Sequence, residues 1–468
     1  MKHMNRRSFL KKAGMGAALL SMPSVLFGGE QVSRKPNVVF ILADDWGWGD
    51  LGCYGNEEIR TPNINRMARQ GLRFEQFYVS AAVCSPSRAT FMTGLFTDRH
   101  GIHSHLNDMD GQRERGMPLY LDPNLPNVPS LLKQAGYATA HYGKWHLTST
   151  DDTDAPTPAD YGFDHHKVTV GSGDGKHVQP GRPEGWNVWE EARPGPNWHK
   201  WRARASEMIF DEAVGFIEEH KDQPFYIQAW LYDTHAVLTP NEEQREPFEE
   251  MPSTYQTYYS AVYDSDRHIG RLLKKLDEMG LAENTIVIFS SDNGPEEISL
   301  WEAMEFGVGD PGPFRGRKRS GYEGGIRLPF IVRWPKGTPA GKVDETTVLS
   351  AADFLPTICS LAGVRYPAED DIDGVDMSSA WKGKPRERKE PIYWALQENV
   401  IGPKINVSPK LIIREGRWKL MMHYDGSGVE LYDIGANSLE VDNLADTHPE
   451  VAERLKKKRL ERYEKYGI

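Results

Sequence analysis

Four apolar runs rich in β-branched residues stand out along the chain, and each is followed by polar or charged residues. Continuous apolar runs of this length are typical of strands buried on both faces, as in parallel sheets that helices cover. The predicted strands span residues 37–43, 138–142, 224–230 and 285–291. Amphipathic helical patterns separate them, including residues 128–135, 205–219 and 255–279. This alternation predicts an α/β fold with a large mixed, mostly parallel sheet sandwiched by helices.

The pattern changes from about residue 366 onward. Short extended segments follow one another there, at residues 391–396, 410–413, 418–423 and 429–434, before an amphipathic helical stretch at 449–463. Short alternating strands favour an antiparallel sheet with one solvated face. We therefore predict a catalytic domain over residues 34–365 and a smaller C-terminal α+β subdomain, a sheet closed by a helix, over 366–468.

The chain begins with a basic segment that contains Arg6 and Arg7, followed by a short apolar stretch from 13 to 27. This stretch is too short and too interrupted by Gly and Pro to span a bilayer. Its layout is typical of a signal peptide with a twin-arginine start. We predict a leader over residues 1–29, export to the periplasm or the cell exterior, and no membrane span.

The composition of the 468 residues is that of an ordinary soluble enzyme, with 26% charged residues and a formal net charge of −11. This balance argues against nonspecific binding to nucleic acid, so an anionic ligand requires a local cluster of basic residues. Only three cysteines occur, at 53, 84 and 359, which rules out a disulfide framework. We expect Cys53 in a loop or a small-residue packing position, and Cys359 packed in a helix. Nothing in the sequence indicates an oligomeric state.

Polar residues at the ends of the predicted strands are expected to meet, because parallel strands deliver their carboxyl ends to one edge of a sheet. Asp44 and Asp45 follow the first strand, and Asp292 and Asn293 follow the strand at 285–291. Oxygen ligands alone suit a hard cation such as Ca²⁺ or Mg²⁺. An Asp pair after a strand is also common in caps and turns, so the spacing leaves both interpretations open.

Cys84 opens a segment in which the start and the end of a helix are both encoded. Ser85 is the predicted N-cap, Pro86 suits the first helical position, and Gly94 suits a left-handed end. A helix N-terminus favours an anion, and Arg88 is expected to project back toward Cys84. A nucleophile beside an anion cradle suggests attack on an anionic ester. The alternative is a buried structural cysteine in a capped helix.

Residues 84–94 match the sulfatase signature C-x-P-S-R-x-x-x-(L or M)-T-G at every fixed position. The chain thus resembles the formylglycine-dependent, type I sulfatases of the alkaline phosphatase superfamily. Further family elements occur in family order: GKWH at 143–146, Thr234-His235, and F-R-G-x-K at 314–318 with EGG at 323–325. One departure is Ala236, where many relatives carry a proline. It leaves the shape of the loop after His235 in question.

The resemblance implies that Cys84 is oxidised to formylglycine (3-oxoalanine). The hydrate of this aldehyde, held by Arg88, then attacks the sulfate sulfur. The resemblance also implies that Lys144 and Lys318 bind sulfate oxygens, that His235 protonates the leaving alcohol, and that His146 accepts a proton as sulfate is eliminated. The implied metal is Ca²⁺, with Mg²⁺ as the alternative. The implied metal ligands are Asp44, Asp45, Cys84, Asp292 and Asn293.

The function predicted from this resemblance is removal of sulfate from a sulfated carbohydrate, such as a glycosaminoglycan or marine polysaccharide fragment. A cytoplasmic formylglycine-generating enzyme is the implied partner. The tryptophan-rich stretch at 161–201 is either a loop pinned by aromatic packing or a sugar-stacking wall. Two other functions stay open: a phosphonate or phosphate ester hydrolase of the same superfamily, and a noncatalytic glycan-binding pseudoenzyme.

Overall fold

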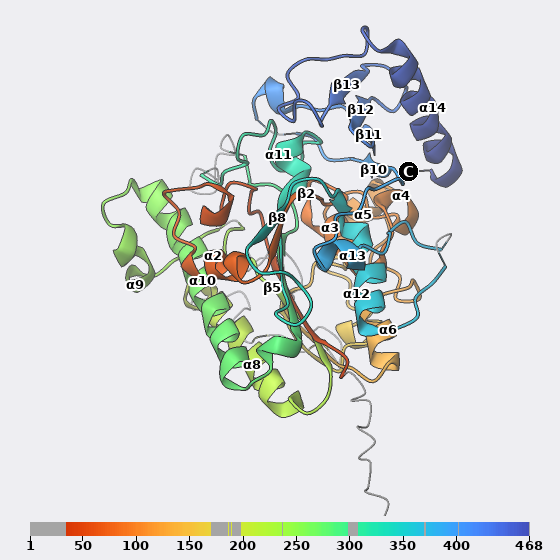
Figure 1. Cartoon of the computed structure of the whole chain (residues 1–468). Helices are drawn as coiled ribbons and strands as arrows, with labels where there is room; N and C mark the ends of the chain where they lie inside the picture. Colours follow the sequence, from red (N-terminus) through yellow and green to blue (C-terminus); the bar gives the residue numbers. More distant parts are fainter. Residues whose placement is uncertain are drawn as a thin grey trace, which may run out of the picture. The chain divides into compact units, whose positions relative to one another are not determined.

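The computed structural model describes residues 34–169, 186, 189, 198–235, 237–297, 308–368, 371–400 and 402–467. Its contacts divide the chain into two units, Met1–Lys35 and Pro36–Ile468. The second unit contains every helix and strand named below (Figure 1). The predicted leader at 1–29 lies outside the described residues and stays a prediction.

Among the described residues, nine strands form one large sheet (Figure 1). They are β1 (Asn37–Ala43), β2 (Leu72–Tyr78), β3 (Ala138–Lys144), β4 (His165–Thr169), β5 (Phe225–Trp230), β6 (Thr285–Ser291), β7 (Arg327–Arg333), β8 (Lys342–Asp344) and β9 (Leu349–Ser350). The order is β4-β3-β5-β1-β6-β7-β2-β8, with β9 paired to β2. The strands from β4 to β6 run parallel, whereas β7 is antiparallel to both of its neighbours. The predicted mixed, mostly parallel sheet is confirmed.

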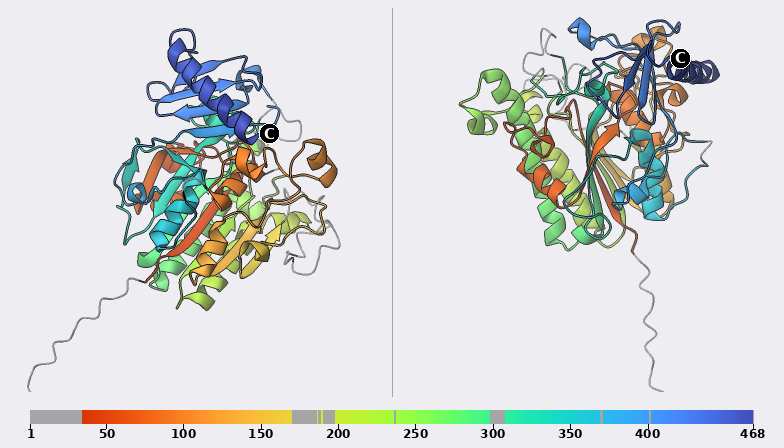
Figure 2. Two further views of the ribbon diagram at one scale, coloured as in Figure 1. Left: turned by 90° about the vertical axis from the view of Figure 1, so that its right-hand side faces the viewer. Right: turned by 45° about the horizontal axis from the view of Figure 1, so that its top comes forward.

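Helices cover both faces of this sheet, and β1 shows why. Its side chains alternate between two hydrophobic clusters: Phe40 faces one and Ile41 faces the other. The first face carries α3 (Cys84–Thr93), α6 (Val128–Gln134) and α12 (Phe354–Ala362), and the second carries α2 (Pro62–Arg69), α8 (Ala205–His220) and α10 (Ser253–Glu278) (Figure 2). Shorter helices lie in the connections: α4 (Thr97–His100), α5 (Met109–Glu114), α7 (Trp198–Arg202), α9 (Glu242–Arg245), α11 (Glu323–Ile326) and α13 (Ser378–Trp381).

The C-terminal region forms a second, antiparallel sheet, as predicted. Its described strands are β10 (Ile392–Ala395), β11 (Leu411–Glu415), β12 (Trp418–Met422) and β13 (Glu430–Asp433), and α14 (Pro449–Tyr466) packs across them (Figure 2). The indole of Trp394 donates a hydrogen bond of 2.7 Å to the carbonyl of Val79, next to β2. One hydrophobic cluster therefore continues from the large sheet into the small one.

The predicted start of the Cys84 helix is wrong by two residues. The helix α3 begins at Cys84 with Val83 as its N-cap, and no side chain caps it. The Ser85 hydroxyl instead accepts a hydrogen bond of 3.0 Å from the amide of Leu106. Gly94 does end the helix in the left-handed conformation, at φ 72°. The thiol consequently lies in the first turn of the helix, not ahead of it.

The described tryptophans of the 161–201 stretch favour the packing interpretation. Trp186, Trp189 and Trp201 are all buried, and Trp201 stacks against Tyr232 with ring centroids 5.4 Å apart. Of the two histidines in this stretch, His165 in β4 is exposed and His166 is half-buried. Within the described part of the chain, no helix is both long enough and apolar enough to cross a bilayer.

Candidate active site

The carboxyl ends of the central strands bring the predicted metal ligands together. Asp45, after β1, donates its backbone N–H to Oδ1 of Asp292, after β6, over 3.2 Å. The Asn293 amide donates to Oδ1 of Asp45 over 2.7 Å. Asp44, Asp45, Asp292 and Asn293 are all buried. Residues some 250 positions apart meet because β1 and β6 are paired along their whole length.

Three ligand atoms lie close enough together to hold one metal ion. One atom each of Asp44, Cys84 and Asp292 lies within 4.8 Å of the others. Two further observations fit a cation: Oδ1 of Asp44 and Oδ1 of Asn293 are buried and find no hydrogen-bond donor among the described residues. Such oxygens cost free energy unless something satisfies them. This oxygen-rich set suits a hard divalent cation.

The predicted cations lie around the same carboxylates. Arg88 donates from Nη2 to Asp292 Oδ2 over 2.7 Å and from Nη1 to the carbonyl of Lys144 over 3.0 Å. Lys144 Nζ lies 2.6 Å from Asp44 Oδ2, and Lys318 Nζ lies 2.6 Å from Asp45 Oδ2. The three basic side chains are almost completely buried. A positive lining therefore borders the thiol of Cys84 in a chain whose net charge is negative.

The close spacing of these buried charges shifts the pKa values of the site residues. Burial raises the pKa of Asp44, but the charges of Lys144 and its cationic neighbours outweigh burial and bring the pKa well below the ordinary value. Burial and the repulsion of Asp44 raise the pKa of Asp292 to about 7. Burial opposes protonation of Lys318, yet the carboxylates of Asp45 and Glu296 raise its pKa. A divalent cation would relieve the repulsion between the carboxylates.

His146 has one ring nitrogen without a hydrogen-bond partner among the described residues. Its ring Nε2 lies 3.0 Å from the carbonyl of Leu106, and a carbonyl can only accept, so this nitrogen carries the hydrogen. Nδ1 is then unprotonated, and it is buried with no hydrogen-bond partner among the residues described. Burial and the charges of Lys144 and Arg88 hold the pKa of His146 well below its usual value. The neutral imidazole thus offers a free lone pair at Nδ1.

His235 follows β5 and is fixed through the backbone. The guanidinium of Arg202 donates to the carbonyl of His235 over 2.5 Å and also to that of Tyr232. Thr234 donates its hydroxyl to the carbonyl of Asp44. The His235 side chain contributes to lowering the pKa of Asp44, so its ring lies near the metal ligands. Ala236, the departure from the family pattern, is outside the described residues.

Two close backbone approaches show why glycine occupies fixed positions in the matched motifs. A Cβ on Gly143 would lie 1.9 Å from the carbonyl oxygen of Trp230, and its φ is 110°. A Cβ on Gly325 would lie 2.1 Å from the carbonyl oxygen of Ser320, in the loop that carries Lys318. Only glycine allows these close approaches. The motif glycines therefore let the backbone segments next to Lys144 and Lys318 pack into the site.

Sequence reasoning missed Glu296, which belongs to the site. Its carboxylate lies 3.4 Å from Lys318 Nζ and pairs with Arg319. Burial raises the pKa of Glu296, but Lys318 and Arg319 lower it to about 2. The residue follows the Asp292-Asn293-Gly294 element by two positions. That proximity was the available signal, but a carboxylate in an irregular loop has no periodicity to identify it.

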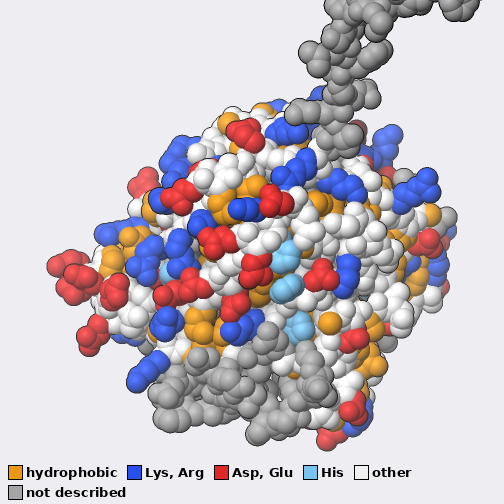
Figure 3. Space-filling model, turned by 90° about the horizontal axis from the view of Figure 1, so that it is seen from below, with side chains coloured by type: hydrophobic (Ala, Val, Ile, Leu, Met, Phe, Trp, Pro, Cys, Tyr) orange, Lys and Arg blue, Asp and Glu red, His pale blue; other side chains and the backbone are white. Residues whose placement is uncertain are grey.

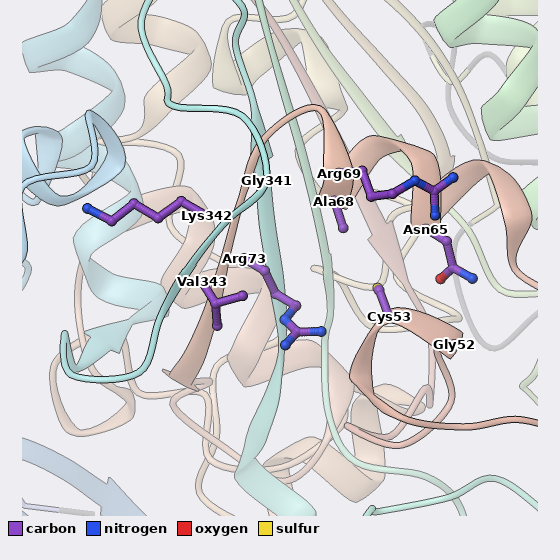
Figure 4. Close-up of a pocket in the computed structure, with 9 residues that line it drawn as sticks. All are labelled: Gly52, Cys53, Asn65, Ala68, Arg69, Arg73, Gly341, Lys342 and Val343. Carbon is purple, nitrogen blue, oxygen red and sulfur yellow. The ribbon is translucent and has the colours of Figure 1, made fainter.

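The other two cysteines take no part in this site. Cys359 lies buried in α12, as predicted. Cys53 lies in a short 3₁₀ helix, Gly52–Tyr54, and lines a separate cavity of about 300 Å³ between α2 and β8 (Figure 4). Burial raises the pKa of both thiols to about 12, so both are protonated at neutral pH.

The molecular surface away from the site carries both signs of charge. On the face seen from below, Lys and Arg side chains are interspersed with Asp and Glu (Figure 3). Opposite charges mixed in this way cancel at a distance larger than their spacing. The described side chains on this face therefore show no concentration of positive charge.

The fold is that of an alkaline phosphatase-like hydrolase, and its site combines a buried cysteine with carboxylates and basic side chains. Residues 36–364 match the family model described as Sulfatase, and residues 312–465 match the model N-sulphoglucosamine sulphohydrolase, C-terminal. The chain belongs to the sulfatase family and is a sulfuric ester hydrolase. In this family a formylglycine and a divalent metal are the general rule, and the cluster at Asp44, Cys84 and Asp292 provides a possible metal site.

Similar proteins are known over most of the chain's length. N-acetylgalactosamine-6-O-sulfatase of Bacteroides thetaiotaomicron is 28% identical and covers 91% of this chain and 92% of its own. Human N-acetylgalactosamine-6-sulfatase is 34% identical and covers 78% of this chain and 69% of its own. The crystal structure of Ps i-CgsB in complex with k-i-k-neocarrahexaose superposes with a TM-score of 0.75 at 26% identity, over 91% of this chain and 93% of that one.

Proposed function

We propose that this sulfuric ester hydrolase removes sulfate from a sulfated carbohydrate, with a 6-sulfated N-acetylgalactosamine unit as the first candidate. The observation that carries the proposal is the cluster of Asp44, Cys84 and Asp292 within reach of one ion, bordered by buried Arg88 and Lys144. Two similar sulfatases carry the name of that sugar, and a similar structure contains a carrageenan hexaose. A glycosaminoglycan or marine polysaccharide fragment is the corresponding natural source.

We also propose the groups that complete the site. The ligands of a Ca²⁺ ion would be Asp44, Asp45, Asp292, Asn293 and the modified residue 84. Such an ion would supply positive charge at the sulfate, and the aldehyde hydrate of 3-oxoalanine at position 84 would supply the attacking hydroxyl. The unpartnered oxygens of Asp44 and Asn293 support this assignment. A formylglycine-generating enzyme would act on Cys84 before export.

The chain's own side chains would then bind the sulfate and move protons. Lys144 and Lys318 neutralise the negative charge of the sulfate oxygens, and Arg88 orients residue 84. His235 donates a proton to the departing sugar oxygen. His146 accepts, at Nδ1, the proton that is released when sulfate leaves; its hydrogen bond to Leu106 and its lowered pKa support that role.

The N-terminal residues fit an exported enzyme. We propose that residues 1–29 are a twin-arginine leader and that the mature enzyme works in the periplasm or outside the cell. The basic pair Arg6-Arg7 and the short apolar stretch after it support this location. We keep the division into a catalytic domain at 34–365 and a C-terminal subdomain at 366–468 as part of the same proposal.

The deciding experiment offers the purified enzyme a panel of defined esters. The panel holds 4-nitrophenyl sulfate, N-acetylgalactosamine 6-sulfate, other sulfated glycosaminoglycan and carrageenan fragments, and an aryl phosphate and phosphonate. We expect turnover of the aryl sulfate and of sulfated saccharides, with products located by NMR. Faster turnover of the phosphorus esters would favour the alternative hydrolase. Aryl sulfate turnover with every saccharide untouched would refute the carbohydrate assignment.

Two measurements on the same preparation test the proposed groups. Mass spectrometry of the peptide containing residue 84 should show the loss of sulfur that converts cysteine to 3-oxoalanine. Metal analysis should show about one Ca²⁺ per chain, as expected for a single oxygen-ligand cluster. An unmodified thiol in fully active enzyme would exclude the formylglycine, and stoichiometric Mg²⁺ would replace Ca²⁺ as the proposed ion.

A further inference from the structure

A carboxylate from the C-terminal region reaches the segment that follows the Cys84 helix. Glu398 lies after β10, and its Oε1 is 2.5 Å from His105 Nδ1 and 3.7 Å from Arg115 Nη1. The Ser104 hydroxyl also contacts Oε1 and accepts a hydrogen bond of 2.6 Å from Arg115. These contacts join residues almost 300 positions apart into one polar cluster, which we call the Glu398 cluster: Ser104, His105, Arg115 and Glu398.

This Glu398 cluster is directly connected to the active site. The amide of Leu106, the residue after His105, donates to Ser85 Oγ over 3.0 Å, and its carbonyl lies 3.0 Å from His146 Nε2. His105 is near enough to influence the pKa of His146. On the other side, the charge of Arg319, next to Lys318, acts on Glu398. The carboxylate is therefore connected to the start of α3 through residues 104–106, and it lies within electrostatic range of Arg319 in the loop that carries Lys318.

The cluster is open to solvent, unlike the buried metal ligands. The side chain of His105 is 32% exposed and that of Glu398 is 16% exposed, whereas the Asp44 side chain is 0% exposed. Lys410 anchors the loop by donating to the carbonyl of Gln397 over 3.2 Å and to Asn399 Oδ1 over 3.0 Å. Among the contacts of the described residues, all those made by the Glu398 carboxylate use Oε1. The Glu398 carboxylate is thus fixed through Oε1 and remains partly exposed.

We infer that Glu398 is a specificity-determining residue, which accepts hydrogen bonds from free hydroxyls of the monosaccharide that carries the scissile sulfate. The inference rests on the proposed function, which names a sulfated carbohydrate as the substrate. It specifies in addition which kind of sugar unit the enzyme accepts. An anionic substituent beside the scissile sulfate, such as a second sulfate or a uronate carboxylate, meets a like charge at this position. The favoured class is a monosulfated unit with free neighbouring hydroxyls.

The chemistry of the cluster suits this role. Burial raises the pKa of Glu398, but the contact with His105 and the charge of Arg319 outweigh burial and bring the pKa below its usual value, so the group is ionised at neutral pH. An ionised carboxylate only accepts hydrogen bonds, and sugar hydroxyls donate them. The held Oε1 and the anchored loop fix its orientation before substrate arrives, which lowers the entropic cost of binding.

The experiment compares Glu398→Gln with Glu390→Gln, which removes an exposed carboxylate at the other end of β10. The substrates are 4-nitrophenyl sulfate and whichever monosulfated saccharide of the panel the wild type hydrolyses. We expect E398Q to lower kcat/KM for the saccharide by about 10-fold or more, as for loss of a hydrogen bond to a charged group. The loss on the aryl sulfate should be smaller by about 10-fold, because that substrate has no sugar hydroxyls. E390Q should change neither.

A second readout tests the charge discrimination. The rate on a saccharide with a second sulfate beside the first, relative to the monosulfated one, should rise in E398Q because the repelling charge is gone. If E398Q loses the same factor of kcat/KM on the aryl and saccharide substrates and has a lowered Tm, Glu398 only supports the structure. A kcat/KM of E398Q for the saccharide equal to that of wild type would also overturn the inference. Absence of any saccharide turnover by the wild type would refute the proposed function instead, since aryl sulfate turnover is scored separately.

Discussion

Two buried groups of charged side chains differ in what they do for the molecule. The first is the active-site cluster at the ends of β1 and β6, built around Asp44 and Lys144. The second, which we call the joint cluster, lies between the two sheets and consists of Tyr78, Glu323, Lys419 and Glu440. In the joint cluster, Lys419 Nζ is 2.9 Å from Glu323 Oε1 and 2.8 Å from Glu440 Oε1.

The two clusters contain similar ion pairs, but they differ in how their side-chain oxygens are satisfied. In the active-site cluster, Oδ1 of Asp44 and Oδ1 of Asn293 lack a hydrogen-bond donor within the described part of the chain. In the joint cluster, one ammonium serves two carboxylates from separate segments, and Tyr78 donates to Glu323 Oε2 over 2.5 Å. Glu440 Oε1 also makes no hydrogen bond with the residues that the structure describes, but Lys419 Nζ lies 2.8 Å from it, whereas the guanidinium of Arg88 lies 3.7 Å from Asp44 Oδ1. Glu323 belongs to the matched EGG element, yet its contacts tie the small sheet to the large one. A buried ion pair alone does not identify a catalytic site; what distinguishes the active-site cluster is that ligand atoms of Asp44, Cys84 and Asp292 converge within 4.8 Å of one another at the strand ends.

The largest expected effect comes from breaking the active-site cluster at its nucleophile. Cys84→Ala should lower kcat for aryl sulfate by about 10⁴-fold or more, because no other described side chain can replace the attacking group. The Tm should stay near that of the wild type, since alanine suits a buried helical position. Cys359→Ala, a buried cysteine in α12, serves as the control and should keep its activity. Retained turnover in C84A would refute the nucleophile assignment.

The next effect separates proton transfer from binding within the same cluster. His235→Ala should lower kcat for a sugar sulfate by about 10²–10⁴-fold, because an alkoxide leaves poorly without a proton. The loss should shrink with 4-nitrophenyl sulfate, whose phenolate needs little protonation. Exposed His423→Ala should affect neither substrate. Equal losses of H235A on both substrates would remove His235 from the role of general acid.

A substitution in the joint cluster should lower the stability of the fold and leave the catalytic rate nearly unchanged. Lys419→Met removes the ammonium shared by Glu323 and Glu440 and leaves Glu323 with Arg327 Nη1 at 3.5 Å, so the free energy of unfolding should fall by about 3–5 kcal/mol in denaturant titrations. At temperatures where the variant is folded, kcat/KM for aryl sulfate should stay within about threefold of wild type, since the site residues are untouched. Lys457→Met, on the exposed side of α14, is the matched control. Similar denaturation midpoints of K419M and K457M would contradict the proposed joint.

The smallest effect is the dependence of the joint cluster on pH. Burial and the negative charge of Glu323 raise the pKa of Glu440 to about 7, although the charge of Lys419 lowers it. The unfolded chain loses this proton at lower pH than the folded chain, so the contribution of Glu440 to stability is present at low pH and is lost as pH rises toward its folded pKa. From about pH 5 to pH 8, wild type should lose about 2 kcal/mol relative to Glu440→Gln. Parallel pH profiles of the two proteins would show that Glu440 does not titrate there.

Much of the fold could be predicted from apolar runs alone. The predicted bounds of β1 and β6 match the structure residue for residue, because a strand buried on both faces leaves an uninterrupted apolar signal. The start of α3 was misplaced because the Ser85 hydroxyl is used by Leu106, a tertiary contact that no local pattern reports. The tryptophan-rich stretch was ambiguous for a similar reason: aromatic side chains suit a core and a sugar surface equally, and only burial separates them.

The sequence by itself determined the chemical groups that are available: a cysteine at a helix start, acids after two strands, and a set of lysines and histidines. Those identities follow from local patterning and from motif spacing, both of which are written along the chain. Only the tertiary structure decided which groups face one another. It paired Lys419 with Glu323 and brought Glu398 to His105, since strand pairing and sheet packing join positions whose separation in sequence carries no local signal.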